Sequence, residues 1–230
     1  MGHVITLYHG SEQVVETPIF GKGKEHNDFG KGFYCTADEN LAKEWGVSSL
    51  RNGFANRYTI DTEYLKILNL NSPDFSILNW IAVLVEHRVF SLQTPVARRA
   101  KQYLIDHFSL NVNAYDIVTG YRADDSYFDY AEAFINNGIS VDQLAWAMYL
   151  GKLGEQIVIK SQYAFSLLHF EGFAIAEKDQ YFVSRKARND EANRNYWEML
   201  EEESDGLYIR DIIRGGIEND DPRIPRNLSE

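Results

Sequence analysis

The chain has 230 residues, of which 44% are hydrophobic and 25% charged, and this balance predicts a folded globular protein while excluding a disordered or fibrous one. Its 34 Asp and Glu residues against 23 Lys and Arg give a formal charge of -11, which disfavours functions that depend on nonspecific attraction to polyanions. The length suits a single domain over residues 1–210, with a helical insertion at about 72–110 and a loosely ordered tail over 211–230.

The first half of the chain is predicted to begin with short strands. Apolar runs rich in β-branched and aromatic residues place these strands at 4–8, 33–35, 54–60 and 66–70. A glycine-rich loop, residues 11–32, separates the first two strands, and loops of this length are often functional. We therefore expect functional residues at the two ends of this loop.

Helices are predicted between and after these strands. Thr36 and Glu39 have the spacing of a capping box, which opens a helix that Gly46 ends. Apolar residues at helical spacing predict a helix over 77–88, and Thr94 followed by Pro95 predicts the start of another that reaches Phe108. These two helices form the expected insertion.

The second half is predicted to mix strands and helices. In chain order we expect a strand at 115–119, helices at 127–137 and 144–150, a strand at 156–159, a helix at 162–170, a strand-like segment at 173–183 and a charged helix at 187–204. Strands that occur early and late, on either side of a helical block, indicate an α+β domain with a mainly antiparallel or mixed sheet.

The single cysteine bears on the compartment. Cys35 has no partner for an intrachain disulfide, so a reducing, cytoplasmic setting is expected. The Cys and His residues do not show the spacing of a zinc site, and we expect no metal. The most apolar segment, 77–90, is interrupted by charges and too short to span a bilayer, so no membrane partner is expected.

Common nucleotide-binding patterns do not fit the glycine-rich loop. Gly30 and Gly32 lack the third glycine of a Rossmann turn, and neither Lys22 nor Lys31 is followed by the Ser or Thr of a P-loop. Cys35 has no nearby His or Asn that would mark it as a nucleophile, which favours a small core residue.

A combination of three motifs is more informative. Leu7-Tyr-His-Gly-Ser11 ends the first strand, Asp28-Phe-Gly-Lys-Gly-Phe-Tyr34 leads into the second, and Gly154-Glu-Gln-Ile-Val-Ile159 forms a late strand. Over roughly 4–60 and 115–170, this order resembles the ADP-ribosyltransferase superfamily, in its poly(ADP-ribose) polymerase-like branch. Within it, the chain is most similar to an uncharacterised bacterial domain family often linked to toxin–antitoxin systems.

The resemblance implies an ADP-ribosyltransferase-like split sheet and NAD as the substrate. The nicotinamide ring of NAD is flat and cationic while it is bonded to ribose, and it leaves as neutral nicotinamide when the glycosidic bond breaks. The site must therefore hold a flat cationic ring before the reaction. Tyr34 and Trp45 are expected to sandwich this ring, the Gly10 backbone to approach the carboxamide, and His9 to donate a hydrogen bond to a ribose hydroxyl. The NAD-binding residues implied are His9, Gly10, Ser11, Gly32, Tyr34 and Trp45.

The third motif leaves two candidates for the remaining catalytic position. Glu155 and Gln156 are adjacent on a strand, so only one of them can enter the cleft. We favour Gln156, which can hold a hydroxyl but cannot act as a base. Asp124 and Asp125, in the turn after a strand, could supply the carboxylate or contact the acceptor, or simply cap the following helix.

The expected function is transfer of ADP-ribose from NAD to a macromolecular acceptor, with a bacterial toxin and an antitoxin partner implied by the resemblance alone. The net charge favours a protein acceptor over nucleic acid, although the cluster of Arg185, Lys186, Arg188 and Arg194 is a candidate patch for a phosphate-bearing partner. Two alternatives stay open. They are a noncatalytic module that binds NAD, ADP-ribose or a partner protein, and an NAD glycohydrolase with water as the acceptor.

Overall fold

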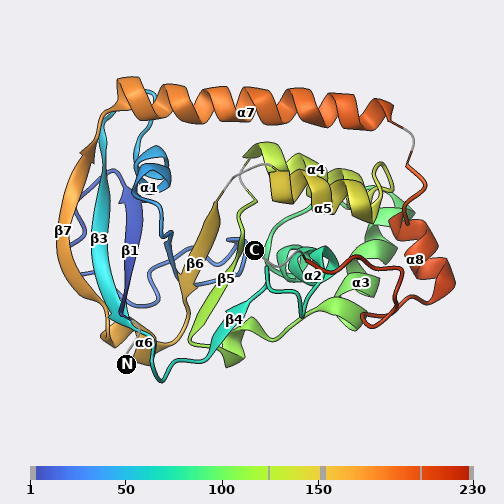
Figure 1. The fold of residues 1–230 in the computed structure, drawn as a ribbon, viewed down its shortest axis with the longest axis horizontal. Coiled ribbons are helices and arrows are strands. Elements are labelled where there is room, and N and C mark those ends of the chain that lie inside the picture. The colour runs from blue at the N-terminus through green and yellow to red at the C-terminus, as the bar shows by residue number, and fades with distance from the viewer. Residues whose placement is uncertain (1–3, 124, 151–153, 203, 228–230) are drawn as a thin grey trace.

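The computed structural model describes residues 4–123, 125–150, 154–202 and 204–227. Its elements in chain order are β1 (Val4–Ser11), β2 (Phe33–Cys35), α1 (Glu39–Gly46), β3 (Gly53–Asp61), β4 (Ile67–Asn69), α2 (Ile77–His87), α3 (Pro95–Phe108), the 3-10 helix η1 (Val112–Ala114), β5 (Ile117–Tyr121), α4 (Asp125–Ile135), α5 (Val141–Leu150), β6 (Glu155–Ile159), α6 (Gln162–Ser166), β7 (His169–Ala176), α7 (Lys178–Glu201) and α8 (Ile209–Gly215). The strands lie towards one end of the molecule and most helices towards the other (Figure 1).

The strands form two sheets. One has the order β1-β3-β7 and is antiparallel, and the other has the order β2-β6-β5-β4 and is mixed, because β4 and β5 run parallel. The sheets meet at one bridge, where the Tyr8 N–H donates to the Thr36 carbonyl at 2.8 Å and the Thr36 N–H to the Tyr8 carbonyl at 3.0 Å. The expected α+β class with antiparallel and mixed strands is confirmed.

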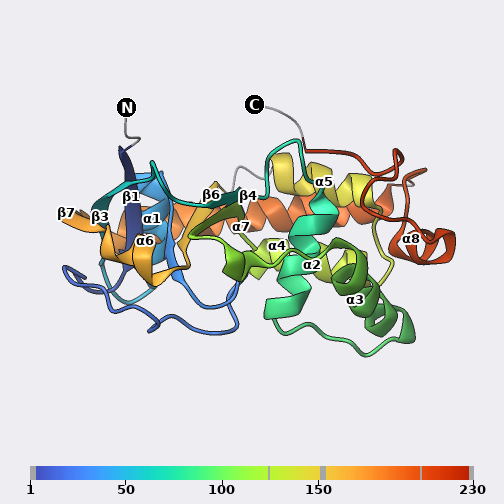
Figure 2. The same ribbon diagram turned by 90° about the horizontal axis from the view of Figure 1, so that it is seen from below.

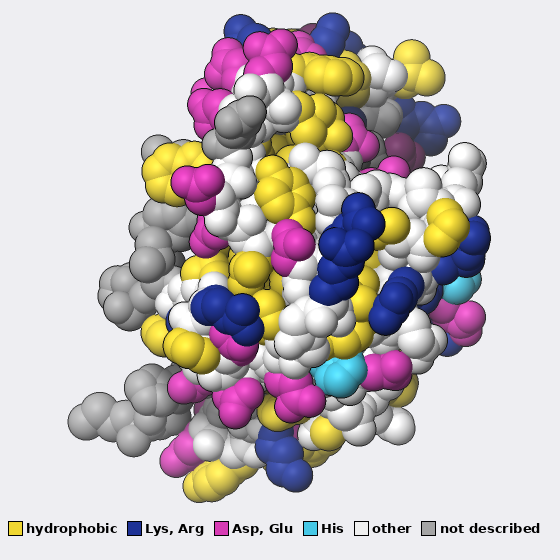
Figure 3. All heavy atoms as spheres, turned by 90° about the vertical axis from the view of Figure 1, so that its right-hand side faces the viewer, with side chains coloured by type: hydrophobic (Ala, Val, Ile, Leu, Met, Phe, Trp, Pro, Cys, Tyr) yellow, Lys and Arg dark blue, Asp and Glu magenta, His cyan; other side chains and the backbone are white. Residues whose placement is uncertain are grey.

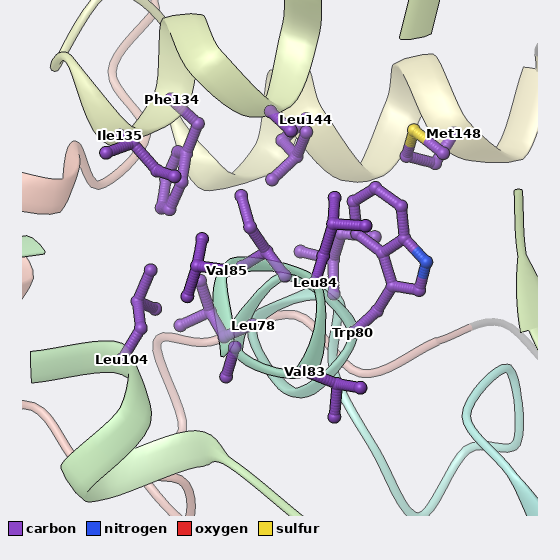
Figure 4. Close-up of a cluster of buried hydrophobic side chains, with 14 of the residues drawn as sticks. Leu78, Trp80, Val83, Leu84, Val85, Leu104, Phe134, Ile135, Leu144 and Met148 are labelled. Carbon is purple, nitrogen blue, oxygen red and sulfur yellow. The ribbon is translucent and has the colours of Figure 1, made fainter. Parts of the chain in front are cut away.

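The larger core is built around α2, in which Asn79 is the one polar residue between Ile77 and Val85. Residues 77–85 of this helix are all buried, as a helix without a polar face must be. Figure 4 shows Leu84 and Trp80 of α2 pointing towards Leu144 and Met148 of α5. Each such side chain contributes about 1.5–3 kcal/mol on full burial. Together with α3, this helix occupies the stretch 72–110 that was expected to form a helical insertion.

The smaller core lies on the other face of the mixed sheet, which α6 covers. Its buried residues come from both sheets and from α6; they are Leu7, Cys35, Ile60, Ile117, Ile157, Ile159 and Ala164. Cys35 is fully buried, and burial raises the pKa of its thiol well above the ordinary value. The cysteine therefore packs as a small apolar residue.

The longest helix, α7, runs alongside both halves of the molecule (Figures 1 and 2). It begins at Lys178 rather than at 187, and the preceding strand ends at Ala176 rather than at 183. The first turns of α7 are held against α1, where the Arg185 guanidinium donates to the Glu44 and Val47 carbonyls at 3.2 and 3.3 Å. Among the described residues, no helix combines the length and the apolar character that crossing a membrane requires.

Strand β7 also begins earlier than the pattern indicated. The helix expected over 162–170 ends at Ser166, and His169 already pairs with Thr59 of β3. The side chains of β7 alternate between more and less exposed positions, as they do in an edge strand. Pairing with β3 therefore outweighs the amphipathic pattern of this short segment.

The expectation of a loosely ordered tail over 211–230 is wrong for the described residues, which reach position 227. Helix α8 spans Ile209–Gly215, and Ile212, Ile217 and Ile224 are all at most 3% exposed. The Asn227 side-chain amide donates to the Leu70 carbonyl at 2.7 Å. Isolated isoleucines between charged residues make no regular pattern, yet each of them fills a place in the larger core.

Candidate functional site

The first two motifs meet where the two sheets join. His9 lies near the end of β1, and its Nδ1 is 2.8 Å from the carbonyl oxygen of Tyr34 on β2. The His9 ring also packs on Phe33, with the ring centroids 4.5 Å apart. Because a carbonyl oxygen can only accept, Nδ1 carries the hydrogen.

Burial lowers the pKa of His9, although its hydrogen bond to the Tyr34 carbonyl opposes the shift. The imidazole is therefore neutral near pH 7. In the neutral ring with its hydrogen on Nδ1, Nε2 is an acceptor. A ribose hydroxyl would thus donate to His9, whereas the resemblance implied the opposite direction.

A cavity of about 230 Å³ lies on the opposite side of β2. We call it the Tyr34 pocket, and its lining residues are Asn27, Asp28, Tyr34, Trp45, Arg88, Arg122, Ala123 and Gln156. They come from the end of the glycine-rich loop, β2, α1, the end of α2, the segment after β5, and β6. The fold thus brings three of the sequence-predicted site residues, Tyr34, Trp45 and Gln156, to one cavity. His9, Gly10, Ser11 and Gly32 are not among its lining residues.

Asp28 is bonded to several other lining residues of the Tyr34 pocket, and no sequence pattern indicated a role for it. It is 4% exposed, and its Oδ1 lies 3.1 Å from a guanidinium nitrogen of Arg88. Its Oδ2 accepts from the Ala123 N–H and from Gln156 Nε2, both at 2.9 Å. Burial raises the pKa of Asp28, while the hydrogen bond from Ala123 and the charge of Arg88 act in the opposite direction.

The alternation along β6 separates the two candidates of the third motif. Gln156 is 2% exposed and faces the Tyr34 pocket, whereas Glu155 is exposed and accepts from the Asn71 side-chain amide at 2.6 Å. Gln156 Nε2 also donates to the Tyr121 carbonyl at 3.0 Å, so both of its hydrogens are used within the chain. Its Oε1 is then the atom left to accept from a ligand.

Tyr34 uses its hydroxyl to hold the end of the glycine-rich loop. The hydroxyl donates to the Gly30 carbonyl at 2.6 Å and accepts from the Phe29 N–H at 3.0 Å. Burial raises the pKa of Tyr34, so the phenol stays neutral. A ligand in the pocket would therefore meet the ring of Tyr34 rather than its hydroxyl.

The ring of Trp45 already contacts a cation of the same chain, the guanidinium group of Arg122. The guanidinium carbon of Arg122 lies 4.7 Å from the centre of the Trp45 ring, a cation–π contact that occupies one face of the indole. The buried Nε1 of Trp45 has no hydrogen-bond acceptor among the described residues. A ligand ring in the pocket would therefore share Trp45 with Arg122, and a full sandwich between Tyr34 and Trp45 must leave room for that guanidinium.

The two glycines implied in NAD binding have packing roles in the structure. A Cβ on Gly10 would lie 2.0 Å from the Ala42 carbonyl oxygen of α1. A Cβ on Gly32 would lie 2.4 Å from a methyl group of Val158 on β6. Both positions therefore exclude any side chain because another element packs directly against the backbone.

Ser11 belongs to an anchor at the start of the glycine-rich loop. Asn56, which is fully buried on β3, donates through Nδ2 to the His9 carbonyl, the Ser11 hydroxyl and the Gln13 carbonyl at 3.1–3.2 Å. Its Oδ1 accepts from the Val15 N–H at 2.8 Å. A buried side chain that bonds to four groups between His9 and Val15 fixes the path of the chain after His9.

The other end of the loop is anchored by Lys160. Its Nζ donates to the Phe29 carbonyl at 2.7 Å and to the Lys31 carbonyl at 2.9 Å. Burial lowers the pKa of Lys160 to about 8. Neither Asn56 nor Lys160 had a sequence signal, because burial of a polar residue depends on what packs around it.

The remaining candidates lie elsewhere or outside the description. Asp124 lies outside the described residues, and Asp125 is the first residue of α4, with its side chain outside the described part. In the basic cluster of α7, Arg188 pairs with Glu44 at 2.7 Å and Arg185 is bonded to α1 as described above. Within the described part of the chain, His, Cys, Asp and Glu side chains form no group of three or more that could hold a metal ion.

Comparisons with known proteins identify a family that matches the chain. A family model described as "Protein of unknown function (DUF3990)" matches residues 5–170, more than two thirds of the chain. The matched stretch includes the whole lining of the Tyr34 pocket. A search of the curated proteins and a search of the solved structures found no match.

Proposed function

The chain belongs to the DUF3990 family, and we propose that it binds NAD in the Tyr34 pocket and transfers ADP-ribose from it to a macromolecular acceptor. The observation that carries the proposal is the convergence on one cavity of Tyr34 from the second motif, Trp45 from the helix that follows it, and Gln156 from the third motif. The motifs occur in the order and spacing that resemble ADP-ribosyltransferases.

The chemistry of the pocket suits one end of a dinucleotide. Its volume of about 230 Å³ lies below the roughly 300–1,000 Å³ of most ligand sites, so it would take the nicotinamide and ribose and leave the rest of NAD outside. The ring of Trp45, which lines the cavity and already contacts the Arg122 guanidinium, is of the kind that attracts a flat cationic ring. The planar guanidinium of Arg122 can pair with phosphate oxygens, which carry the negative charge of NAD.

The reaction breaks the bond between C1′ of the nicotinamide ribose and the ring nitrogen. The electron pair stays with nicotinamide, which leaves neutral, and a nucleophilic atom of the acceptor bonds to C1′ and loses its proton. Gln156 would accept from a ribose hydroxyl through Oε1 and orient the sugar. An amide cannot remove the acceptor's proton, so the acceptor or solvent must provide for that step.

A second candidate function follows from the state of Asp28. It is the one carboxylate among the described lining residues of the pocket, and its oxygens already accept from Arg88, Ala123 and Gln156. A pocket without an available carboxylate favours a module that binds NAD or ADP-ribose without turnover. A third candidate function is hydrolysis of NAD, with water as the acceptor.

One labelling experiment distinguishes these functions. The chain is incubated with NAD labelled in its adenine, with and without cell extract, and nicotinamide, free ADP-ribose and labelled macromolecules are measured by mass spectrometry. Transfer predicts nicotinamide with labelled macromolecules, and hydrolysis predicts nicotinamide with free ADP-ribose. Binding alone predicts saturable retention of NAD without either product, and no retention at all would contradict NAD as the ligand.

Two variants link the result to the pocket. Gln156→Ala removes the side chain that faces the cavity, and Glu155→Gln changes its neighbour that faces away. We expect the first to lower nicotinamide release at least 10-fold and the second to leave it within about 2-fold, since only positioned polar contacts affect the transition state. Equal losses in both variants would show that β6, rather than the pocket, had been disturbed.

The toxin and antitoxin roles are part of the same proposal and rest on the family resemblance alone. We propose a protein acceptor, because a chain of net charge -11 repels nucleic acid. Growth arrest on expression in bacteria, relieved by Gln156→Ala but not by Glu155→Gln, would support a toxin. Growth unaffected by the unmodified chain would contradict it.

A further inference from the structure

A second and larger hollow lies in the helical half of the molecule, between α4, α5 and the C-terminal half of α7, which lies alongside them in Figure 1. We call it the Trp146 groove. Its volume is about 560 Å³, and its lining includes Tyr127, Asp142, Gln143, Trp146, Glu198 and Glu202. None of these residues touches the Tyr34 pocket, so the groove is a separate feature.

The groove is negatively charged. Three of its described lining residues are the acids Asp142, Glu198 and Glu202, and none of the described lining residues is a Lys or Arg. None of the three makes an ion pair with another described residue. Asp and Glu side chains also gather at the top of Figure 3, on the side where α7 lies.

The positions of these acids leave their charges uncompensated. Glu198 lies in the last turn of α7 and Glu202 is its C-cap residue four positions later, and both line the groove. Asp142, in the first turn of α5, lines the same groove. A cation placed in the groove would be attracted by all three carboxylates.

An exposed tryptophan lies among these charges. Trp146 is 58% exposed, although a tryptophan side chain has a large apolar surface that folded proteins usually bury. Two further lining residues, Tyr127 and Tyr130, are buried and stack with their centroids 5.6 Å apart, which adds a rigid aromatic surface to the groove. Trp beside carboxylates is the combination that holds a guanidinium or ammonium group.

We propose that the Trp146 groove docks a basic segment of a partner protein, with an arginine or lysine side chain lying on Trp146 between the carboxylates of Asp142 and Glu198. The volume of the groove, about 560 Å³, is larger than one arginine or lysine side chain needs. It therefore favours binding of several residues of the partner chain. Tryptophan and arginine dominate the binding energy of protein interfaces, and the negative groove selects the basic partner. This inference does not rest on the proposed reaction.

The test measures binding of a dye-labelled acetyl-hexa-arginine amide to the full chain by fluorescence anisotropy, without NAD. We expect saturable one-to-one binding that weakens as salt is raised. Trp146→Ala should raise Kd about 3- to 30-fold, as loss of a desolvated cation–π contact would. Glu198→Gln should raise Kd several-fold, with unchanged thermal unfolding as the check on folding.

Two control variants lie outside the groove. Trp197 is 65% exposed and Glu201 is exposed, both on α7, and neither belongs to the lining. Trp197→Ala and Glu201→Gln should leave Kd within about 2-fold. If they weaken binding as much as the groove variants do, the peptide is held by general surface charge and the proposal is overturned. If spermidine displaces the peptide at a concentration equal to the Kd of the peptide, the groove is a site for small organic cations instead, which also overturns it.

Discussion

Gln156 and Asp28, 128 positions apart in the chain, are joined by a hydrogen bond of 2.9 Å from the amide Nε2 to the carboxylate Oδ2. This contact links β6 to the end of the glycine-rich loop. The same carboxylate holds Arg88 after α2 and the backbone of Ala123 after β5. The wall of the Tyr34 pocket is therefore one polar network centred on a buried acid, in which each member positions the others.

Replacement of this acid by its amide should destabilise the whole network. In Asp28→Asn, one oxygen becomes an NH₂ group that faces the donors of Arg88, Ala123 or Gln156. We expect the free energy of unfolding to fall by about 1–3 kcal/mol, the usual cost of a buried unsatisfied donor. Urea unfolding measures it, with Asp179→Asn as the control, because the Asp179 side chain is 89% exposed. An unchanged midpoint for Asp28→Asn would contradict this network.

Protonation of His9 should make stability depend on pH. Its folded pKa lies below the ordinary value of 6.5, so the unfolded chain takes up a proton first as the pH falls. The stabilising contribution is therefore present above pH 6.5 and is lost as the pH falls towards the folded pKa. His87, whose pKa burial also lowers, adds in the same direction.

Urea unfolding at pH 7.5, 6.5 and 5.5 measures this effect. His9→Asn should reduce the fall in stability between pH 6.5 and 5.5, and the remainder should come from His87 and the carboxylates. His169→Asn is the control, because His169 is exposed on β7. The same pH profile for His9→Asn and the unmodified chain would show that His9 is not held neutral.

The close approach of α1 to β1 should make Gly10 irreplaceable. In Gly10→Ala the new methyl group would lie 2.0 Å from the Ala42 carbonyl oxygen, so the helix must shift. We expect a loss of about 1–3 kcal/mol or more, as for other overpacked sites. Gly215→Ala is the matched control, since the nearest neighbours of a Cβ there are Cγ1 and Cδ1 of the Ile217 side chain at 3.2 and 3.5 Å, with no backbone atom as close as at Gly10. Circular dichroism during thermal unfolding checks both variants, and equal midpoints would contradict the close packing.

Loss of the Lys160 anchor should loosen the end of the glycine-rich loop. Lys160→Met keeps an apolar stem but removes the two hydrogen bonds to the carbonyls of Phe29 and Lys31. Amide hydrogen exchange at 29–32 should become faster, while exchange in α2 stays unchanged. Lys178→Met is the control, because Lys178 pairs with Asp179 at the start of α7, away from the loop. Unaltered exchange at 29–32 would show that Tyr34 alone holds this segment.

Local signals in the sequence predicted most elements of the fold. The start of α3 follows from Thr94 and Pro95, and the Thr94 hydroxyl does accept from the Ala97 N–H at 3.0 Å. The start of α1 lies two residues later than a capping box of Thr36 and Glu39 indicates, because the N-cap is Asp38, whose side chain accepts from the Asn40 and Leu41 N–H groups. The larger errors are at β7, the start of α7 and the tail, where pairing and burial outweigh local pattern. Elements such as β5 and α4 are shifted by two residues from the ranges that the sequence indicated.

For the pocket, the sequence by itself determined which residues were candidates and, through strand alternation, that Glu155 and Gln156 face opposite sides. Only the tertiary structure decided which of the two faces the pocket, since the face depends on how β6 lies between β2 and β5. It also showed Asp28, Arg88 and Arg122 as pocket residues. Their exposure is set by chain segments distant in sequence, and no local pattern carries that information.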